Sequence, residues 1–497
     1  MALTEDKIFT NLAAQPTHRS VAQYVYRHYP NLILQVDDDV FLLTLENRWK
    51  KVKVPDLHTP VYNAIIKLMS LHKQIRRNEY DQKLFNEICN KFRKYIENNS
   101  QMSSILRELL PMYSRDLAFD DNPNLIGFTD GVLDLTTMTP RLYKSDDYIT
   151  MTVGYKYSNN INQQKTAELY ALFNKILPDP EMQKCVLSIL ASCLRGVQSE
   201  YFNLFLGNGR NGKSTISTLM LNALGDYAYI LAVNVLTSKD KSTLSPEKAQ
   251  LHLKRYILCS EPETTGNNEA GAVINVSQIK RLTGSSAIVA RQLWSNSLKT
   301  KLRGTYVYEC NEIPSFNIID TAIQQRIMYI PFETKFILGI FNDAELFTRN
   351  DPLRPVYKAD DSFNTDGFAV SHRLEFMHIL IQTFLQSNGQ PYYPQEVGLL
   401  SNQYLINQSP FLTWFTRNFT RDLNSPAEQW VSVDFIYTIF TSQHNVRRNH
   451  FENENAKHIT IDFITLIFES VTFFGKDKLT HPNGNVIMRY WILNQAP

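Results

Sequence analysis

The stretch LGNGRNGKST, from Leu206 to Thr215, lies near the middle of the 497-residue chain and decides how the rest is interpreted. From Gly207 to Ser214 it fits G-x-x-x-x-G-K-[ST], a pattern typical of loops that hold the phosphates of a nucleoside triphosphate. The apolar run YFNLFL before it predicts a buried strand, and STISTLMLNALG after it predicts a helix that ends at Gly225. Strand, glycine-rich loop and helix in this order predict a nucleotide site.

Each part of the loop has an expected role in that site. Glycines let backbone N–H groups converge on phosphate oxygens, and the N-terminus of the helix adds partial positive charge. Lys213 is expected to reach the β- and γ-phosphates of ATP or another NTP, and the Ser214 hydroxyl is expected to bind Mg²⁺. The predicted nucleotide-binding residues are Gly207, Asn208, Gly209, Arg210, Asn211, Gly212, Lys213, Ser214 and Thr215.

Two further apolar runs end in polar residues downstream of the loop. Residues 256–260 predict a buried strand followed by Glu261 and Glu263, of which one acid can hold the Mg²⁺ shell and the other can polarise the attacking water. Residues 305–310 predict a third strand followed by Asn311, whose amide can orient water against the γ-phosphate. Each feature alone also suits a solvated turn or a cap, and their order after the loop is what favours catalysis.

Arg326 follows a short predicted helix in DTAIQQRIMYIPF and opens another apolar run. An arginine in this place can reach the nucleotide of a neighbouring subunit in a ring ATPase and stabilise transition-state charge. A salt bridge within its own subunit is the alternative.

A basic segment lies between the strand-end acids and Asn311. Residues 270–308 contain no Asp or Glu, and AIVARQLWSNSLKTKLRG predicts a β-hairpin that turns at 295–297. On its second arm the basic residues recur at period two, which predicts one shared face. Such a face suits a phosphate backbone, with a solvated surface as the alternative. The predicted DNA-binding residues are Lys280, Arg291, Lys299, Lys301 and Arg303.

The overall composition narrows the class of protein. A net charge of +2 means that the chain as a whole is not a basic nucleic-acid binder, so contacts with a polyanion must come from local patches. The 5 cysteines are scattered without a CxxC pair, which argues against a disulfide framework or a zinc site and favours a reducing compartment. No long apolar run is present, so we expect an intracellular protein without a membrane partner.

Together, the segments GNGRNGKST, SEPE, IKRLTGSSAIVAR, NEIP and DTAIQQRIMYIPF resemble the core of superfamily 3 helicases. The closer resemblance is to the branch found in poxvirus-type primase-helicases, other large DNA viruses and satellite-phage primases. Residues 124–157, with FTDGVLDL, are similar to the segment that precedes the motor in this family. The resemblance implies an ATP-driven hexameric ring with an AAA+-like motor that encircles one DNA strand and moves 3′ to 5′, its basic hairpin gripping the DNA in the pore.

The resemblance also implies a role for each matching residue. It assigns Walker A to Lys213 and Ser214, Walker B to Glu261 and Glu263, sensor 1 to Asn311, the arginine finger to Arg326, and the motif that opens the hairpin to Lys280 and Arg291. Glu261 is taken as the metal ligand beside Ser214, although either acid can be the base. One departure is Gln325-Arg326, where many relatives carry paired basic residues.

The predicted fold class is α/β, with an AAA+-like P-loop motor between a mixed α+β N-terminal region and a helical C-terminal domain. That last domain is either a winged helix or a small α+β packing domain. The predicted parts are a mixed N-terminal region at 1–110, a β-rich segment at 111–165, a helical collar at 166–200, the motor at 201–335 and the C-terminal domain at 336–497. Asp37 and Asp39 resemble the metal pair of a primase, but without a third carboxylate they predict an acidic turn between two strands.

The leading hypothesis is an ATP-dependent hexameric DNA helicase or translocase of viral or phage-type genome replication. Its expected partners are single-stranded or forked DNA, further copies of the chain, a primase and a DNA polymerase, in the host cytoplasm or nucleus. One alternative is a DNA-packaging or structural ring ATPase that binds DNA without unwinding it. Another is a small-molecule P-loop kinase, which the acid-free basic hairpin and the lack of an arginine-rich lid segment disfavour.

Overall fold

A computed structural model describes residues 2–74, 79–237, 246–260, 273–290, 298–311, 314–316, 321–337, 352, 354–363, 365–407, 410–443, 478–480, 486–489 and 491–493. The chain divides into two compact units, Met1–Tyr157 and Ser158–Pro497. Each unit has a hydrophobic core of its own.

The first unit contains helices α1 (Ala2–Ala14), α2 (His18–His28), α3 (His58–Gln74), α4 (Glu79–Glu97) and α5 (Asn99–Leu109). Their apolar faces meet around Phe9, Val25, Ile65, Phe92 and Ile105, all at most 2% exposed. The sequence itself predicts helices at about 60–75 and 80–97, and α3 and α4 confirm both.

Two antiparallel sheets complete this unit. Strands β1 (Ile33–Val36), β2 (Asp39–Leu43) and β3 (Trp49–Val52) form one, and β4 (Leu125–Gly127), β5 (Val132–Asp134) and β6 (Thr139–Arg141) form the other. Asp37 has a left-handed φ of 51° in the turn from β1 to β2, and the Asp39 carboxylate pairs with Lys51 Nζ at 2.5 Å. The acidic turn predicted between two strands is confirmed.

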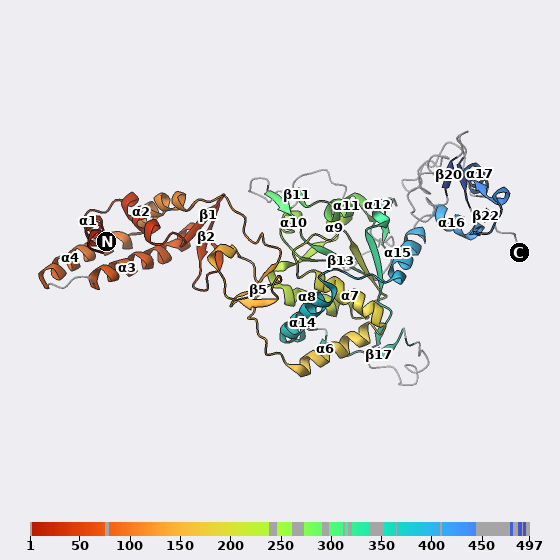
Figure 1. Ribbon diagram of the computed structural model, residues 1–497, viewed down its shortest axis with the longest axis horizontal. Coiled ribbons are helices and arrows are strands. Elements are labelled where there is room, and N and C mark those ends of the chain that lie inside the picture. The colour runs from red at the N-terminus through yellow and green to blue at the C-terminus, as the bar shows by residue number, and fades with distance from the viewer. Residues whose placement is uncertain are drawn as a thin grey trace, which may run out of the picture. The chain divides into compact units, whose positions relative to one another are not determined.

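The second unit is built on a parallel sheet of β7 (Phe202–Leu206), β8 (Ala228–Ala232), β9 (Tyr256–Ser260), β13 (Thr305–Cys310) and β15 (Ile327–Pro331). The strands lie in the order β15-β7-β13-β9-β8, and each neighbouring pair is parallel. The middle strand, β13, is labelled in Figure 1. All residues of β7 and β13 are buried, as their continuous apolar runs predict for central strands. The strands predicted at 201–206, 256–260 and 305–310 are confirmed.

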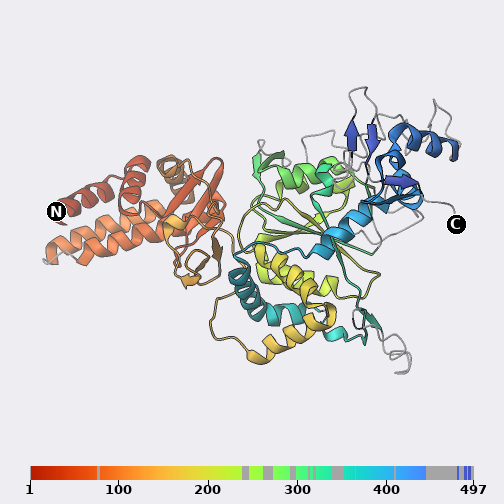
Figure 2. The same ribbon diagram turned by 45° about the vertical axis from the view of Figure 1, so that its right-hand side comes forward.

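Helices cover both faces of this sheet (Figure 2). On one face, α8 (Lys213–Leu224) contacts β8 and β9. The long helix α14 (Asp366–Ser387) packs on α8, and it also contacts α6 (Gln163–Ile176) and α7 (Pro180–Ser192). On the other face lie α9 (Asn234–Thr237), α11 (Val276–Gly284), α12 (Thr321–Gln324) and α15 (Gln395–Asn407). Helix α14 comes after residue 335 in the sequence, yet it packs on α8. The helical layer beside the predicted motor is therefore built from segments that precede the motor in sequence and from segments that follow it.

Shorter elements join these layers. Strands β11 (Ala287–Ala290) and β12 (Leu298–Lys301) pair antiparallel, and β16 (Lys335–Ile337) pairs parallel with β17 (Val356–Lys358). Strand β10 (Val273–Ile274) pairs with β14 (Ser315–Phe316), and α10 (Pro246–Ala249) lies against β11 and β12.

The last described elements form a small core of their own. Helices α16 (Pro410–Asn418) and α17 (Val433–Gln443) pack with β18 (Phe419–Arg421), β19 (Val431–Ser432), β20 (Lys478–Thr480), β21 (Val486–Met488) and β22 (Trp491–Leu493) around Phe415 and Trp491. Strands β20 and β21 pair antiparallel. The sequence predicts a further helix at about 458–471 and a hairpin turn at Asn483-Gly484. Both lie outside the described residues, so the winged helix stays a prediction.

Candidate nucleotide-binding site

The glycine-rich loop joins β7 to α8 at the carboxyl edge of the parallel sheet. Gly212, directly before α8, has a φ of +85°, and a Cβ there would lie 2.5 Å from Cγ1 of Ile176 in α6. A Cβ on Gly207 would meet the backbone oxygen of Phe332 at 2.5 Å. Both positions therefore require glycine, one for its backbone conformation and the other for close packing.

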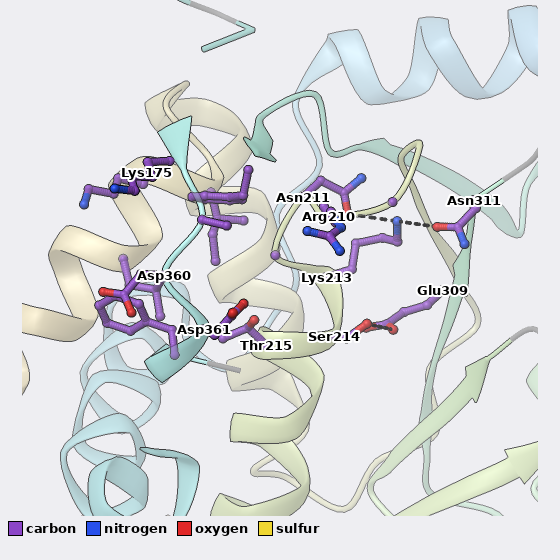
Figure 3. A pocket seen from close by; sticks show the side chains of 18 of the residues that line it. Lys175, Arg210, Asn211, Lys213, Ser214, Thr215, Glu309, Asn311, Asp360 and Asp361 are labelled. Atoms are coloured by element: carbon purple, nitrogen blue, oxygen red, sulfur yellow. Dashed lines mark hydrogen bonds between the residues drawn. The ribbon is translucent and has the colours of Figure 1, made fainter. Parts of the chain in front are cut away.

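Lys213 is held at the first turn of α8. Its side chain is buried, and its Nζ donates to Gly207 O at 2.7 Å, to Asn211 Oδ1 at 3.0 Å and to Asn311 Oδ1 at 3.3 Å. Asn311 follows β13, the neighbour of β7 in the sheet, so the strand order brings the predicted sensor to the predicted phosphate-binding lysine. The structure thus places three residues predicted for the site, Lys213, Asn211 and Asn311, together (Figure 3).

A cavity of about 460 Å³ opens beside the loop. Residues 209–215 and 309–311 line one part of it, and the other part is lined by Leu172, Lys175, Ile176, Phe336, Lys358, Ala359, Asp360, Asp361 and Phe363. Figure 3 shows Ser214, Glu309 and Asn311 at one end and Lys175, Asp360 and Asp361 at the other. A volume of this order lies within the roughly 300–1,000 Å³ typical of small-molecule sites. The far wall was not predicted from the sequence.

Glu309 is a residue of this site that the sequence analysis missed. It lies near the end of β13, is 8% exposed, and its Oε2 accepts a hydrogen bond from Ser214 Oγ at 3.2 Å. Its Oε1 accepts a hydrogen bond from Ser217. Burial raises the pKa of Glu309 above its usual range, although the two serine hydroxyls and the charge of Lys213 favour the ionised form. An acid inside an otherwise uncharged buried strand is the signal that could have identified it.

The donor set at this end of the cavity fits a hard divalent cation. Ser214 offers a hydroxyl oxygen beside the Glu309 carboxylate, and Mg²⁺ prefers oxygen ligands together with water and substrate phosphates. Within the described ranges, no group of three or more His, Cys, Asp or Glu side chains forms a metal cluster. Glu261 and Glu263, the predicted Walker B acids, follow the end of β9 but lie outside the described residues.

Arg326 lies between α12 and β15, as predicted, and is half-buried. Its Nη1 donates to Ala322 O at 2.7 Å, and its buried Nε has no hydrogen-bond partner among the described residues. The described residues that line the cavity do not include Arg326. Its role as an arginine finger towards another subunit stays a prediction.

The predicted basic hairpin is confirmed at the level of its backbone, because β11 and β12 pair over four positions from Ala287↔Lys301 to Ala290↔Leu298. Ile288, Ala290 and Thr300 are buried on one face, whereas Val289 and Lys301 are exposed on the other.

The structure corrects one of the predicted DNA-binding residues. Arg303 follows the end of β12 and is only 8% exposed, so the prediction that it shares the exposed face of Lys301 is wrong. The strand ends before the alternation reaches Arg303, and the chain turns there towards the buried strand β13. Lys280, on α11, is partly exposed. Arg291 and the side chain of Lys299 lie outside the described residues.

The fold and the site together define a mixed α/β protein in which a glycine-rich loop, a buried lysine and a sensor-like asparagine meet at the edge of a parallel sheet. Residues 22–186 match the protein family described as "D5 N terminal like". A putative helicase of Acanthamoeba polyphaga mimivirus is 31% identical over 268 residues, which cover 52% of this chain and 27% of that protein.

Two poxvirus proteins are also similar to the chain. Primase D5 of Fowlpox virus is 28% identical over 62% of this chain and 37% of that protein. An uncoating factor of Vaccinia virus is 26% identical over 71% of this chain and 43% of that protein. The predicted resemblance to the primase-helicases of large DNA viruses is confirmed, and the chain spans less than half the length of these relatives.

A solved structure of the NrS-1 C terminal region aligns with 94% of this chain and 99% of its own, at 9% identity and a TM-score of 0.47. No helix in the described part of the chain combines the length and the apolar character needed to cross a bilayer.

Proposed function

We propose that the chain is the motor of a viral replicative helicase, which hydrolyses ATP or another NTP with Mg²⁺ and moves along single-stranded DNA as a homohexamer. The observation that carries this proposal is the position of Lys213. Its ammonium group is held by Gly207 O, Asn211 and Asn311, where the loop of β7 meets the end of β13. Three neutral oxygens fix the ammonium group beside the cavity, which suits a site for a polyanion.

The two ends of the cavity suit the two ends of a nucleotide. The loop, Lys213 and Ser214 would receive the triphosphate and its Mg²⁺, with N–H groups at the start of α8 directed at phosphate oxygens. Ile176, Phe336 and Phe363, which line the same cavity, offer an apolar surface for the base. The carboxylates of Asp360 and Asp361 there can accept hydrogen bonds from ribose hydroxyls or from an exocyclic amine.

Catalysis would combine positioning with charge stabilisation. Lys213 would neutralise charge on the β- and γ-phosphates, Asn311 would orient the attacking water, and Glu261 with Glu263 would serve the metal and the base. Arg326 would act on the nucleotide of the neighbouring subunit, since it does not line the cavity of its own chain. The exposed face of β11 and β12 would contact the DNA backbone.

The names of the relatives, helicase and primase, support a role in genome replication, where a primase and a DNA polymerase would be the working partners. Strand displacement on forked DNA tests the proposal. The full chain should unwind the fork with ATP and Mg²⁺, and Lys213→Ala should not. DNA-stimulated hydrolysis without displacement would instead indicate a packaging or structural ring. Hydrolysis that ignores single-stranded DNA would indicate an enzyme of small molecules.

The hexamer requires a separate measurement. Electron-microscopy class averages with a non-hydrolysable nucleotide and an oligonucleotide should show six-membered rings. A protein that stays monomeric when saturated with both ligands would contradict the proposed assembly.

A further inference from the structure

Glu309 is a buried carboxyl group to which the proposed reaction gives no role. Alternation along β13 places Thr305, Val307 and Glu309 on the face towards α8, whereas Tyr306 and Tyr308 belong to the core on the opposite face. Both carboxylate oxygens of Glu309 have hydroxyl partners on α8, and the residue also lines the cavity. The acid therefore lies beside the site expected for Mg²⁺ without being exposed to solvent.

We infer that Glu309 is a positioning residue for Mg²⁺, which orients the Ser214 hydroxyl so that its lone pairs face the metal bound with the triphosphate. This inference rests on the proposed function, because it requires a metal–nucleotide complex at the loop. A serine hydroxyl has one proton and two lone pairs. When the Ser214 hydroxyl donates a hydrogen bond to Glu309 Oε2, the lone pairs of Ser214 Oγ can accept another hydrogen bond or bind a cation.

A second set of hydrogen bonds fixes the carboxylate in place. Ser217 Oγ donates to Glu309 Oε1 and lies 2.9 Å from the Tyr256 hydroxyl on β9. Because the proton of Ser217 is directed to Glu309, the Tyr256 hydroxyl must donate to Ser217. Ser217 and Tyr256 are both buried. One oxygen of Glu309 is thus anchored by α8 and β9, which leaves the other aligned with Ser214.

The charge of Glu309 predicts a specific signature. A negative charge in a poorly solvated position attracts a divalent cation and repels a triphosphate that carries no metal. Removing this charge should therefore weaken nucleotide binding when Mg²⁺ is present and leave metal-free binding unchanged or tighter. A residue that only packs the core would alter both kinds of binding in the same direction.

The test is equilibrium binding of a fluorescent non-hydrolysable ATP analogue to the full chain, at graded Mg²⁺ concentrations and in EDTA. Glu309→Ala should raise the Mg²⁺ concentration for half-maximal binding by roughly ten- to a hundredfold, as expected when a hydrogen bond to a charged group is removed. Glu309→Gln keeps the size of the side chain and an acceptor oxygen but removes the charge, so a smaller increase is expected. Neither variant should bind the analogue more weakly in EDTA.

Tyr308→Phe is the matched control, because it removes one polar group from the adjacent buried position on the opposite face of β13. It should match the wild type at every Mg²⁺ concentration. If Glu309→Ala does not fold, the isosteric Glu309→Gln decides the question. Unchanged Mg²⁺ dependence in Glu309→Gln, or equal weakening with and without the metal, overturns the inference. Failure of the wild type to bind the analogue with Mg²⁺ would instead overturn the proposed function.

Discussion

The glycine-rich loop and the basic hairpin each present a lysine, but the structure holds the two lysines in opposite ways. Lys213 is 4% exposed and is fixed by three oxygens within 3.3 Å, whereas Lys301 is exposed on a two-stranded ribbon. A fixed cation suits one ligand in one geometry, and an exposed cation suits a polymer that slides past it. A buried cation is therefore suited to shape-specific binding, and an exposed cation to binding that does not depend on sequence.

The largest effect is expected from Lys213→Ala. Without the ammonium group, the charge on the β- and γ-phosphates is left without its fixed partner, so NTP hydrolysis should fall by about a hundred- to a thousandfold. Phosphate release measured with ATP and Mg²⁺ at saturating nucleotide checks this expectation. A variant that keeps more than a tenth of wild-type hydrolysis would show that the loop lysine is not at the reacting phosphates.

A conservative substitution should separate the two lysines. Lys213→Arg introduces a planar guanidinium into a buried site whose three acceptors fit a compact ammonium, so hydrolysis should fall at least tenfold. Lys301→Arg keeps the charge on an exposed face and should bind single-stranded DNA within about twofold of the wild type, since binding to the DNA backbone depends mainly on charge. Equal losses in both variants would remove the distinction between a fixed and an exposed cation.

The hairpin is tested by combining Lys299→Ala with Lys301→Ala. Unwinding of forked DNA should fall about tenfold, whereas hydrolysis without DNA should stay within about twofold, because Lys301 is not among the described residues that line the cavity. For single-stranded DNA, the slope of log affinity against log salt should become shallower by about 1.4, or about 0.7 for each phosphate that a lysine no longer neutralises.

The control for this pair is Lys50→Ala with Lys53→Ala, which removes the same charge from exposed positions in the first unit. It should leave the salt dependence unchanged. A double hairpin variant that unwinds normally would show that β11 and β12 do not grip the DNA.

The parts of the motor that could be predicted from sequence are those specified locally. Short apolar runs bounded by glycines or polar residues predicted β7, β9 and β13, because central parallel strands are buried on both faces. The glycine-rich loop could also be predicted, because its own residues specify it. Arg303 shows the limit of this reasoning, since alternation predicts a shared face only as far as the strand extends.

The missed parts depend on contacts between distant segments. Glu309 gains its role only because the strand order places β13 beside β7, which brings its carboxylate to Ser214 on α8. The far wall of the cavity combines α6 with residues 358–363, and α14 packs on α8 from a later part of the chain. Contacts between such distant segments cannot be predicted from hydrophobic periodicity or from a motif, because both describe residues that are close in sequence.

The smallest effect concerns the backbone on which the fixed lysine depends. Gly212→Ala places a Cβ at φ +85° and against Ile176, so the second unit should lose about 1–3 kcal/mol of unfolding free energy, the usual cost of a left-handed non-glycine residue. Urea denaturation measures it. Gly398→Ala, in helix α15 with open space around its Cβ, should instead gain about 0.5–1 kcal/mol.

Adding Ile176→Ala to Gly212→Ala separates the two causes of the loss. Gly212→Ala should also weaken nucleotide binding, because it alters the turn before Lys213. The smaller side chain removes the close contact but leaves the backbone strain, so the double variant should recover only part of this lost nucleotide affinity. Full recovery would mean that packing against α6, and not the left-handed turn, is what requires glycine before Lys213. The site would then be fixed by its neighbouring helix as much as by its own loop, and the contrast with the hairpin would rest on tertiary packing alone.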